Sequence, residues 1–87
     1  MRGRDIIGRN IRRIRVERSI SQERLAFDAG VDRSYLGGME RGEENPTVDV
    51  LDKLAATLAI PIADLFAETG ADEPSIGLKR GRKPMRD

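Results

Sequence analysis

Cysteine, histidine and tryptophan are all absent from this 87-residue chain. Without cysteine the chain can form neither disulfide bonds nor thiolate metal sites, and without histidine it lacks the other common transition-metal ligand. We therefore expect no metal and no cofactor, and we expect the protein to work in the reducing cytoplasm. Aromatic residues make up only 3% of the sequence, which suits a helical domain built from Leu, Ile and Ala better than a β-sandwich.

Long apolar runs are missing too. No stretch approaches the roughly 20 apolar residues that a membrane span needs, and the first residues lead into no signal-peptide core, so we expect neither membrane insertion nor export. An enzyme is also a poor interpretation, because His and Cys are absent and a chain this short has little room for a small-molecule pocket.

Charge is distributed unevenly although the formal net charge is only +1. Residues 1–18 carry seven arginines against two acidic side chains, whereas residues 19–66 carry nine acidic against four basic side chains. Net charge alone is therefore a weak argument for a nucleic-acid partner, and sequence motifs are needed to identify one.

Helical periodicity runs through most of the chain and predicts a compact all-α domain of five helices. Ile7, Ile11 and Ile14 fall at i, i+4 and i+7, which forms one stripe on a helix. We expect helices over residues 6–18, 22–29 and 33–41, a fourth after Thr47 and a short fifth with Pro61 in its first turn. The predicted N-caps are Asp5, Ser21, Asp32 and Thr47, and Gly30 and Gly42 are expected to end the second and third helices.

The apolar faces of these helices form the expected core, and the short fifth helix carries further apolar residues. After Ala67 the sequence holds few large apolar residues, too few to offset the entropy lost on ordering. We therefore predict one domain over residues 1–67 and a disordered basic tail over residues 68–87. The expected buried residues of the first four helices are Ile7, Ile11, Ile14, Leu25, Ala26, Ala29, Leu36, Met39, Val48, Leu51, Leu54, Ala55 and Leu58.

Two short helices joined by Ala29-Gly30-Val31-Asp32 are the most informative feature, because a tight glycine-containing turn between short helices defines a helix-turn-helix unit. The second helix of such a unit can enter the major groove of DNA, where its first residues meet base edges. The candidate base contacts in this chain are therefore Arg33, Ser34 and Tyr35.

These three side chains differ in what they can read. The Arg33 guanidinium can donate a bidentate hydrogen bond to O6 and N7 of guanine. The alternative is a contact with phosphate alone. Ser34 discriminates less, because a hydroxyl both donates and accepts. Tyr35 is expected either to contact a phosphate or a thymine methyl group, or to cover the junction between the second and third helices.

Several motifs follow one another at this point of the chain: Ile20-Ser21-Gln22-Glu23-Arg24-Leu25-Ala26, Ala29 to Leu36, Met39-Glu40-Arg41-Gly42, and Asn45-Pro46-Thr47 with Leu51. Together they resemble the phage-repressor or Cro-like helix-turn-helix family, also called the xenobiotic-response-element family, from about Ile7 to Phe66. The resemblance implies a lambda-repressor-like DNA-binding domain. The stretch from Asp32 to Arg41 is also similar to the controller proteins of restriction-modification systems.

The resemblance implies roles for five further residues. Gln22 matches the family's glutamine that donates to a DNA phosphate at a helix N-terminus, where the helix adds its own positive partial charge; the alternative is a solvated side chain. Arg41 and Asn45 match the loop after the recognition helix, which contacts phosphates. Arg15 and Glu40 match an ion pair between the first and third helices, and the alternative is two unrelated surface charges.

The chain departs from the family's pattern at four positions. Gly37 and Gly38 stand where side chains often read bases, and each costs a helix about 1 kcal/mol relative to Ala. They predict either a close approach of the helix backbone to the groove or a smaller recognition code, which we favour. Glu43 and Glu44 stand where basic residues are common, so their repulsion of phosphate is expected to weaken binding. In the tail, the basic run at 79–83 is either a DNA-binding arm or a solubilising end.

The expected function is transcription regulation by a homodimer bound to a palindromic operator in double-stranded DNA, with no small-molecule ligand. The alternative is a protein-interaction module of the same fold, such as an antitoxin subunit. Retention of Gln22, Arg33 and Asn45 favours the regulator. The predicted dimer interface is an apolar cluster at the end of a domain too small to bury all of it, and comprises Ile60, Ile62, Leu65 and Phe66.

Overall fold

A computed structural model describes residues 2–68 of the chain, so the expected tail, with its basic run at 79–83, lies outside the described residues. Over residues 2–68 the chain is helical and contains no strand, as the all-α prediction requires. No helix in this part of the chain is long and apolar enough to cross a membrane. The elements are α1 (Gly3–Glu17), α2 (Gln22–Ala29), α3 (Arg33–Glu40), α4 (Val48–Leu58) and a short 3-10 helix, η1 (Ile62–Phe66).

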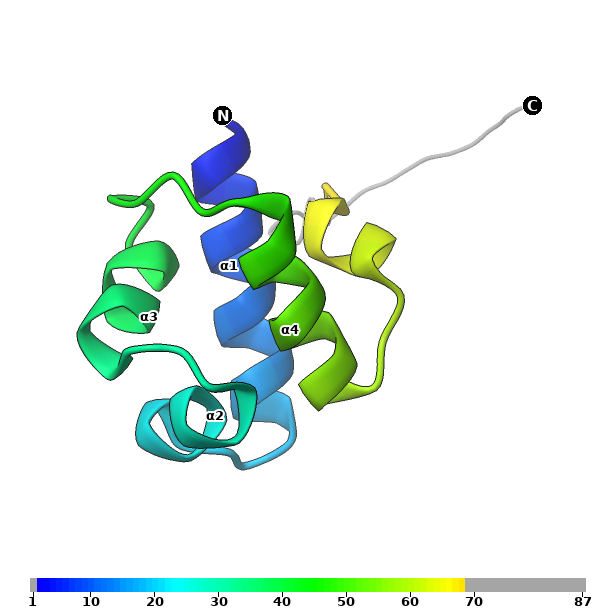
Figure 1. The fold of residues 1–87 in the computed structure, drawn as a ribbon. Helices are drawn as coiled ribbons and strands as arrows, with labels where there is room; N and C mark the ends of the chain where they lie inside the picture. The colour runs from blue at the N-terminus through cyan, green and yellow to red at the C-terminus, as the bar shows by residue number, and fades with distance from the viewer. Residues whose placement is uncertain (1, 69–87) are drawn as a thin grey trace.

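Helix α1 lies between α3 on one side and η1 on the other, with α4 in front of it and α2 across its C-terminal end (Figure 1). Inward-facing apolar residues of all five elements form one core. The core residues predicted on the first four helices are buried, except that Val48 is 63% exposed. Val48 lies in the first turn of α4 and at the edge of its apolar stripe, so its side chain does not reach the core.

Side-chain caps start three of the helices where the sequence predicts them. Ser21, Asp32 and Thr47 each accept a hydrogen bond from the backbone amide three residues later, at 3.0, 3.0 and 3.1 Å. Gly30 ends α2 with a left-handed φ of 71°, a conformation that costs glycine little. The boundaries of α2 and α3 follow from these local signals.

The start of α1 differs from the prediction, because the helix begins at Gly3 and its N-cap is Arg2 rather than Asp5. Asp5 occupies the third position of the helix, and its carboxylate accepts hydrogen bonds from the Arg2 backbone amide at 3.3 Å and from Arg2 Nε at 3.2 Å. An acidic residue reaching back in this way satisfies an amide that the helix leaves unpaired. The side-chain hydrogen bond from Arg2 lowers the pKa of Asp5.

The fifth helix is also different in kind, since η1 is a single short 3-10 segment and Pro61 is its N-cap rather than part of its first turn. The Asp64 amide donates to the Pro61 carbonyl at 3.0 Å, which is the i to i+3 hydrogen bond of a 3-10 turn. The structure thus has four α-helices and one 3-10 helix in its described part.

Close packing of α1 on α3 depends on Gly8. A Cβ atom added at Gly8 would overlap the carbonyl oxygen of Met39 and would lie 3.0 Å from that of Glu40. Both obstacles are backbone atoms of α3, which cannot move aside as a flexible side chain can. Glycine at this position therefore sets how closely α3 approaches α1.

A buried amide holds η1 against the other side of α1. Asn10 is fully buried, and its Nδ2 donates to the carbonyl oxygens of Leu65 at 3.0 Å and Ala67 at 2.7 Å. Its Oδ1 accepts from Arg13 at 3.1 Å. Because every polar atom of this amide is paired, its burial is compensated, and the end of η1 is held in a defined place.

Candidate nucleic-acid interface

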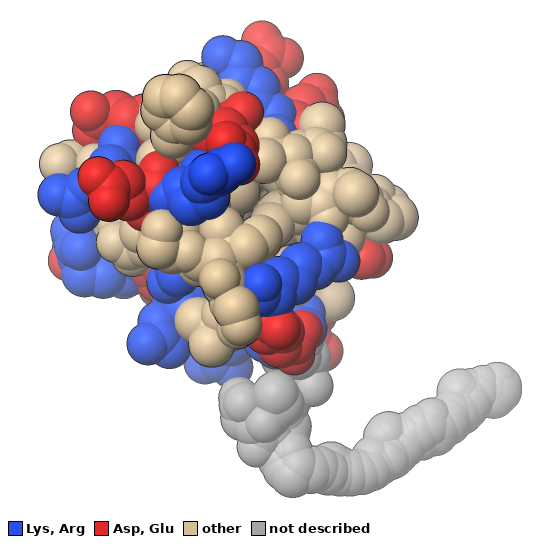
Figure 2. All heavy atoms as spheres, turned by 90° about the horizontal axis from the view of Figure 1, so that it is seen from below, with Lys and Arg blue, Asp and Glu red and all other residues tan. Residues whose placement is uncertain are grey.

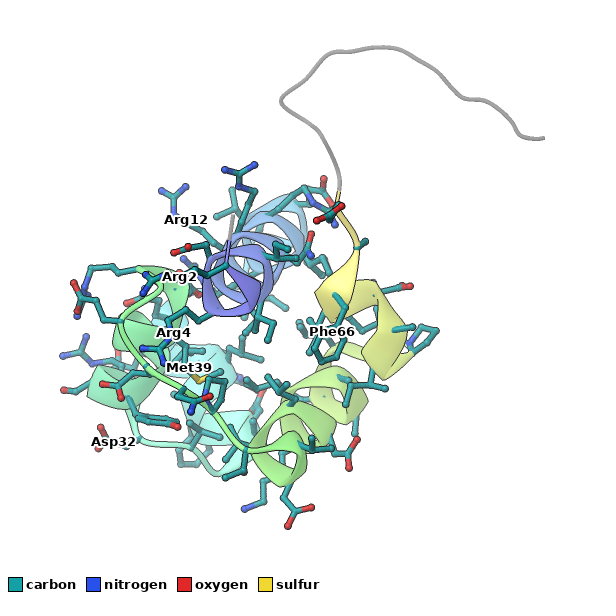
Figure 3. All side chains as sticks on the ribbon, turned by 90° about the horizontal axis from the view of Figure 1, so that it is seen from above. Arg2, Arg4, Arg12, Asp32, Met39 and Phe66 are labelled. Atoms are coloured by element: carbon teal, nitrogen blue, oxygen red, sulfur yellow. The ribbon has the colours of Figure 1, made fainter. Side chains whose placement is uncertain are left out.

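The segment from α2 to α3 forms a helix-turn-helix unit around Gly30. After the left-handed turn, the Val31 amide donates to the Ala26 carbonyl at 2.9 Å, and Asp32 starts α3 (Figure 3). On α3, Leu36 and Met39 are buried in the core. The unit therefore has one face packed inward and another left facing solvent.

The predicted base contacts fall on two different surfaces of α3. Arg33 and Ser34 are exposed in its first turn, where each is free to meet a base edge. Tyr35 is half-buried and packs against the core, as expected of a side chain that covers a helix junction. Its packing role is clear from the structure, and a contact with DNA remains a proposal.

Glu40 joins three helices at the inner side of α3. Its carboxylate accepts from Arg15 Nε at 2.7 Å and Nη2 at 3.0 Å, and from Gln22 Nε2 at 3.0 Å. Arg15 also donates to the Ile20 carbonyl at 2.7 Å. The structure thus brings Arg15 and Glu40 together as a bidentate pair, and we call Arg15, Gln22 and Glu40 the Glu40 cluster.

Burial makes the Glu40 cluster a strong constraint on how α1, α2 and α3 are held together. The Glu40 side chain is 2% exposed and that of Arg15 is 12% exposed. Hydrogen bonding to Glu40 raises the pKa of Arg15, so the guanidinium keeps its charge at every accessible pH. Gln22 is the first residue of α2, and its bond to Glu40 holds the amide in one orientation at the helix N-terminus. Sequence reasoning missed this third member, whose role was predicted only toward phosphate.

The two other predicted phosphate contacts lie after α3. Arg41 is exposed, and its Nε donates to Glu43 at 3.1 Å. Asn45 is exposed as well. The segment that carries them is held to the start of α1, because Arg2 Nη2 donates to the Gly42 carbonyl at 3.5 Å. Asp5 lies close by, since a Cβ atom added at Gly42 would overlap its Oδ1. Arg2 and Arg4 lie beside this segment in Figure 3.

The predicted dimer residues do not form a single exposed surface. Leu65 is fully buried in the core, so its assignment to a dimer interface is wrong: its apolar surface is already used inside the domain. Ile60 and Ile62 are half-buried against the core, whereas Phe66 is 47% exposed. Of the four predicted dimer residues, Ile60, Ile62 and Phe66 retain apolar surface for a partner.

Charges of both signs are mixed on the face of the molecule that Figure 2 shows. Part of this mixing comes from ion pairs within helices, with Arg13 and Glu17 3.6 Å apart on α1 and Arg24 and Asp28 2.8 Å apart on α2. Exposed pairs of this kind stabilise little. The uneven charge along the sequence therefore does not become a face of one sign in the view of Figure 2.

An all-helical domain in which α2 and α3 form such a unit is a helix-turn-helix domain. The family profile HTH_3, described as helix-turn-helix, matches residues 11–65, and the chain belongs to this family. The expected resemblance to phage repressors and restriction-modification controller proteins is confirmed.

Two relatives illustrate the range of the family. An uncharacterized HTH-type transcriptional regulator, y4dJ of Sinorhizobium fredii, is 36% identical over 76 residues, covering 87% of this chain and 96% of the relative. The immunity repressor of Bacillus phage phi105 is 37% identical over 62 residues, covering 71% of this chain and 43% of the repressor.

Two solved structures share the fold. The restriction-modification controller protein C.AhdI from Aeromonas hydrophila has a TM-score of 0.70 at 43% identity, covering 72% of this chain and 96% of that protein. The biofilm regulator SinR, solved in complex with DNA, has a TM-score of 0.67 at 37% identity, covering 70% of this chain and 98% of that one.

Proposed function

We propose that this chain is a sequence-specific DNA-binding transcription regulator that binds a near-palindromic operator as a homodimer, with α3 in the major groove. One observation carries the proposal. Helix α3 presents Arg33 and Ser34 to solvent, while the Glu40 cluster holds its opposite side to α1 and α2. A helix that reads bases must keep its side chains in one orientation, and a supporting set of buried hydrogen bonds provides that.

The contacts divide into base readout and positioning. Arg33 reads guanine, and Ser34 adds a weaker preference beside it. Gln22, Arg41 and Asn45 bind phosphates on either side and set the register of α3 along the duplex. The known DNA complex of SinR and the names of the other relatives as regulators or repressors support this assignment.

Dimerisation is part of the proposal because one recognition helix covers only a few base pairs. Two copies related by a twofold axis double the contacts and place the half-site centres about 34 to 36 Å apart, one turn of DNA. Ile60, Ile62 and Phe66 supply the interface in this scheme. They lie in or next to η1, on the side of α1 opposite α3 (Figure 1), so association there leaves both recognition helices free.

An electrophoretic mobility shift tests the proposal directly. The full chain, with DNA from the region upstream of its own gene, should shift one fragment at moderate salt and unrelated fragments only at low salt, since phosphate contacts alone are strongly salt-dependent. If no fragment shifts even at low salt, the protein-interaction module becomes the correct assignment.

The Arg33→Ala variant then tests how the site is read. It should lose about 1 to 3 kcal/mol of binding free energy and relax the preference at one base pair of each half-site. Asn45→Ala is the control, expected to weaken binding without changing which sequence is preferred. Equal loss on every sequence for Arg33→Ala would make Arg33 a phosphate contact.

A further inference from the structure

Two side chains that follow α3 in the sequence lie back over its two glycines. A Cβ atom at Gly37 would come 3.3 Å from Arg41 Nη1, and a Cβ atom at Gly38 would come 2.8 Å from Glu44 Cγ and 3.0 Å from its Oε2. The space that the glycines leave is therefore occupied by Arg41 and Glu44. Gly37 and Gly38 are buried beneath these side chains although they lie on the outer side of α3.

A left-handed turn at Gly42 returns the chain along the helix. Gly42 has a φ of 76°, and its amide donates to the Met39 carbonyl at 3.0 Å, while the Glu43 amide donates to the Gly38 carbonyl at 2.9 Å. This is the hydrogen-bond pattern of a glycine-ended helix. The turn places Glu44 beside Gly38, and Arg2 Nη2 donates to the Gly42 carbonyl from the α1 side.

Gly38 lies on the face of α3 that the proposed function directs toward DNA. It follows Ser34 by four residues, so the two positions are one helical turn apart on the same face, while Leu36 and Met39 point the other way into the core. The carboxylate of Glu44 therefore stands one turn beyond Ser34. Among residues 2–68 it forms no hydrogen bond or ion pair, so its oxygens are available to a ligand.

The chemistry of a carboxylate restricts which base it can recognise. A carboxylate can only accept hydrogen bonds. In the major groove guanine presents only acceptors, and thymine presents an acceptor and a methyl group, so neither base can donate a hydrogen bond to Glu44. Adenine presents an amino group next to the acceptor N7, which repels a carboxylate. Cytosine alone presents its N4 amino donor without an adjacent acceptor.

We propose that Glu44 is a base-reading residue, whose carboxylate, placed over Gly38, accepts a hydrogen bond from the N4 amino group of a cytosine. The loop then supplies the side chain that α3 lacks at its glycines. Arg41 stands beside it over Gly37, and its positive charge offsets the repulsion between Glu44 and the phosphates. The inference rests on the proposed function, since it requires α3 to lie in the major groove.

Selection of binding sites from a random duplex pool tests the proposal. The wild-type chain should enrich a site with a cytosine at a base pair other than the one that Arg33→Ala relaxes. Glu44→Ala should lower the preference for that cytosine by about tenfold, and Glu44→Gln should move it toward adenine, because an amide pairs with N6 and N7 of adenine. Glu44 lies in the loop after α3 and is only half-buried, and it has no hydrogen bond to lose within the described part of the chain, so the fold should be retained; circular dichroism of both variants checks this.

Two matched variants separate base reading from charge. Glu43→Ala removes the neighbouring carboxylate, which faces Arg41, and should change affinity equally for all sequences. Gly38→Ala keeps Glu44 but displaces it from α3, and should also weaken the cytosine preference. If Glu44→Ala binds every sequence more tightly and keeps the wild-type preference, Glu44 acts by repulsion alone and the inference is wrong. If the wild type enriches no site, the proposed function itself fails.

Discussion

The two sides of α1 hold their neighbours by different chemistry. Toward α3, the contact has two parts: Gly8, where a methyl group would not fit, and the buried ion pair of Arg15 and Glu40. Toward η1, it combines apolar packing with the neutral amide of Asn10 and leaves part of Phe66 exposed. A charged, close contact tolerates little displacement, whereas the η1 side retains apolar surface. In the proposed function, the α3 side reads DNA and the η1 side joins the two copies.

The largest expected effect is on the α3 side, from the Glu40→Ala variant. Removing the carboxylate leaves the buried Arg15 guanidinium without an anionic partner and with only its hydrogen bond to the Ile20 carbonyl, which should cost about 3 to 5 kcal/mol of unfolding free energy. Urea unfolding followed by circular dichroism measures it, with Glu17→Ala, from an exposed pair, as the control. A double-mutant cycle of Arg15→Ala and Glu40→Ala should show coupling above about 1 kcal/mol; additive losses would contradict a shared interaction.

Gly8→Ala tests the closeness of the same contact. The added methyl group meets backbone carbonyls of α3, so α1 and α3 must separate, and we expect a loss of about 1 to 3 kcal/mol. Gly3→Ala is a matched control in the same helix, because nothing lies within 4 Å of the added Cβ. Glycine-to-alanine changes in open helix positions usually stabilise. Similar stability of the two variants would mean that α3 does not need this close approach.

Phe66→Asp tests the η1 side. A carboxylate in an apolar interface is costly, so the variant should be monomeric by sedimentation at a concentration where the wild type is dimeric. Because Phe66 is 47% exposed, part of its ring is also buried inside the domain, so circular dichroism must show that the monomeric variant is still folded. Ala63→Glu, also exposed on η1, shows whether any added charge has the same effect. A wild type that stays monomeric at tens of micromolar would remove the dimer from the proposal.

The smallest effect concerns the Asp5 carboxylate, which accepts hydrogen bonds from Arg2 at the start of α1. Its pKa is lowered in the folded chain, first by the hydrogen bond from Arg2. Its contribution to stability is therefore present above the ordinary pKa of 3.8 and is lost as the pH falls through the lowered value. A carboxyl titration by NMR should place Asp5 below 3.8 in the wild type and closer to it in Arg2→Ala. An unchanged titration in the variant would assign the shift elsewhere.

Local signals predicted much of the fold, and contacts between distant segments account for what was missed. The caps at Ser21, Asp32 and Thr47 are set by side chains a few residues from the backbone groups they bind, so a short window of sequence reveals them. Gly8 and Asn10 act on residues more than thirty positions away. No periodicity marks such roles, although a polar residue beside the apolar stripe of α1 is a usable sign that Asn10 is buried.

In the candidate site, too, the features that local signals determine were predicted from the sequence, whereas the tertiary contacts of Leu65 and Glu44 were not. Arg33 and Ser34 lie where the turn chemistry places them, at the start of α3. Leu65 was assigned to the dimer interface because apolar residues cluster near it, and a sequence cannot show which of several clustered side chains faces inward. The role of Glu44 was equally hidden, since the sequence shows two glycines and two acids but not the turn at Gly42 that brings Glu44 back to the helix.

The Glu40 cluster has a consequence for redesign. It supports α3 entirely from behind, so substitutions at Arg33, Ser34 or Glu44 alter none of its hydrogen bonds. Under the proposed function, new operator preferences can be sought by exchanging these residues in combination, without disturbing the hydrogen bonds of the Glu40 cluster. Glu40, by contrast, accepts from both Arg15 and Gln22, so replacing it removes the acceptor that these two side chains share.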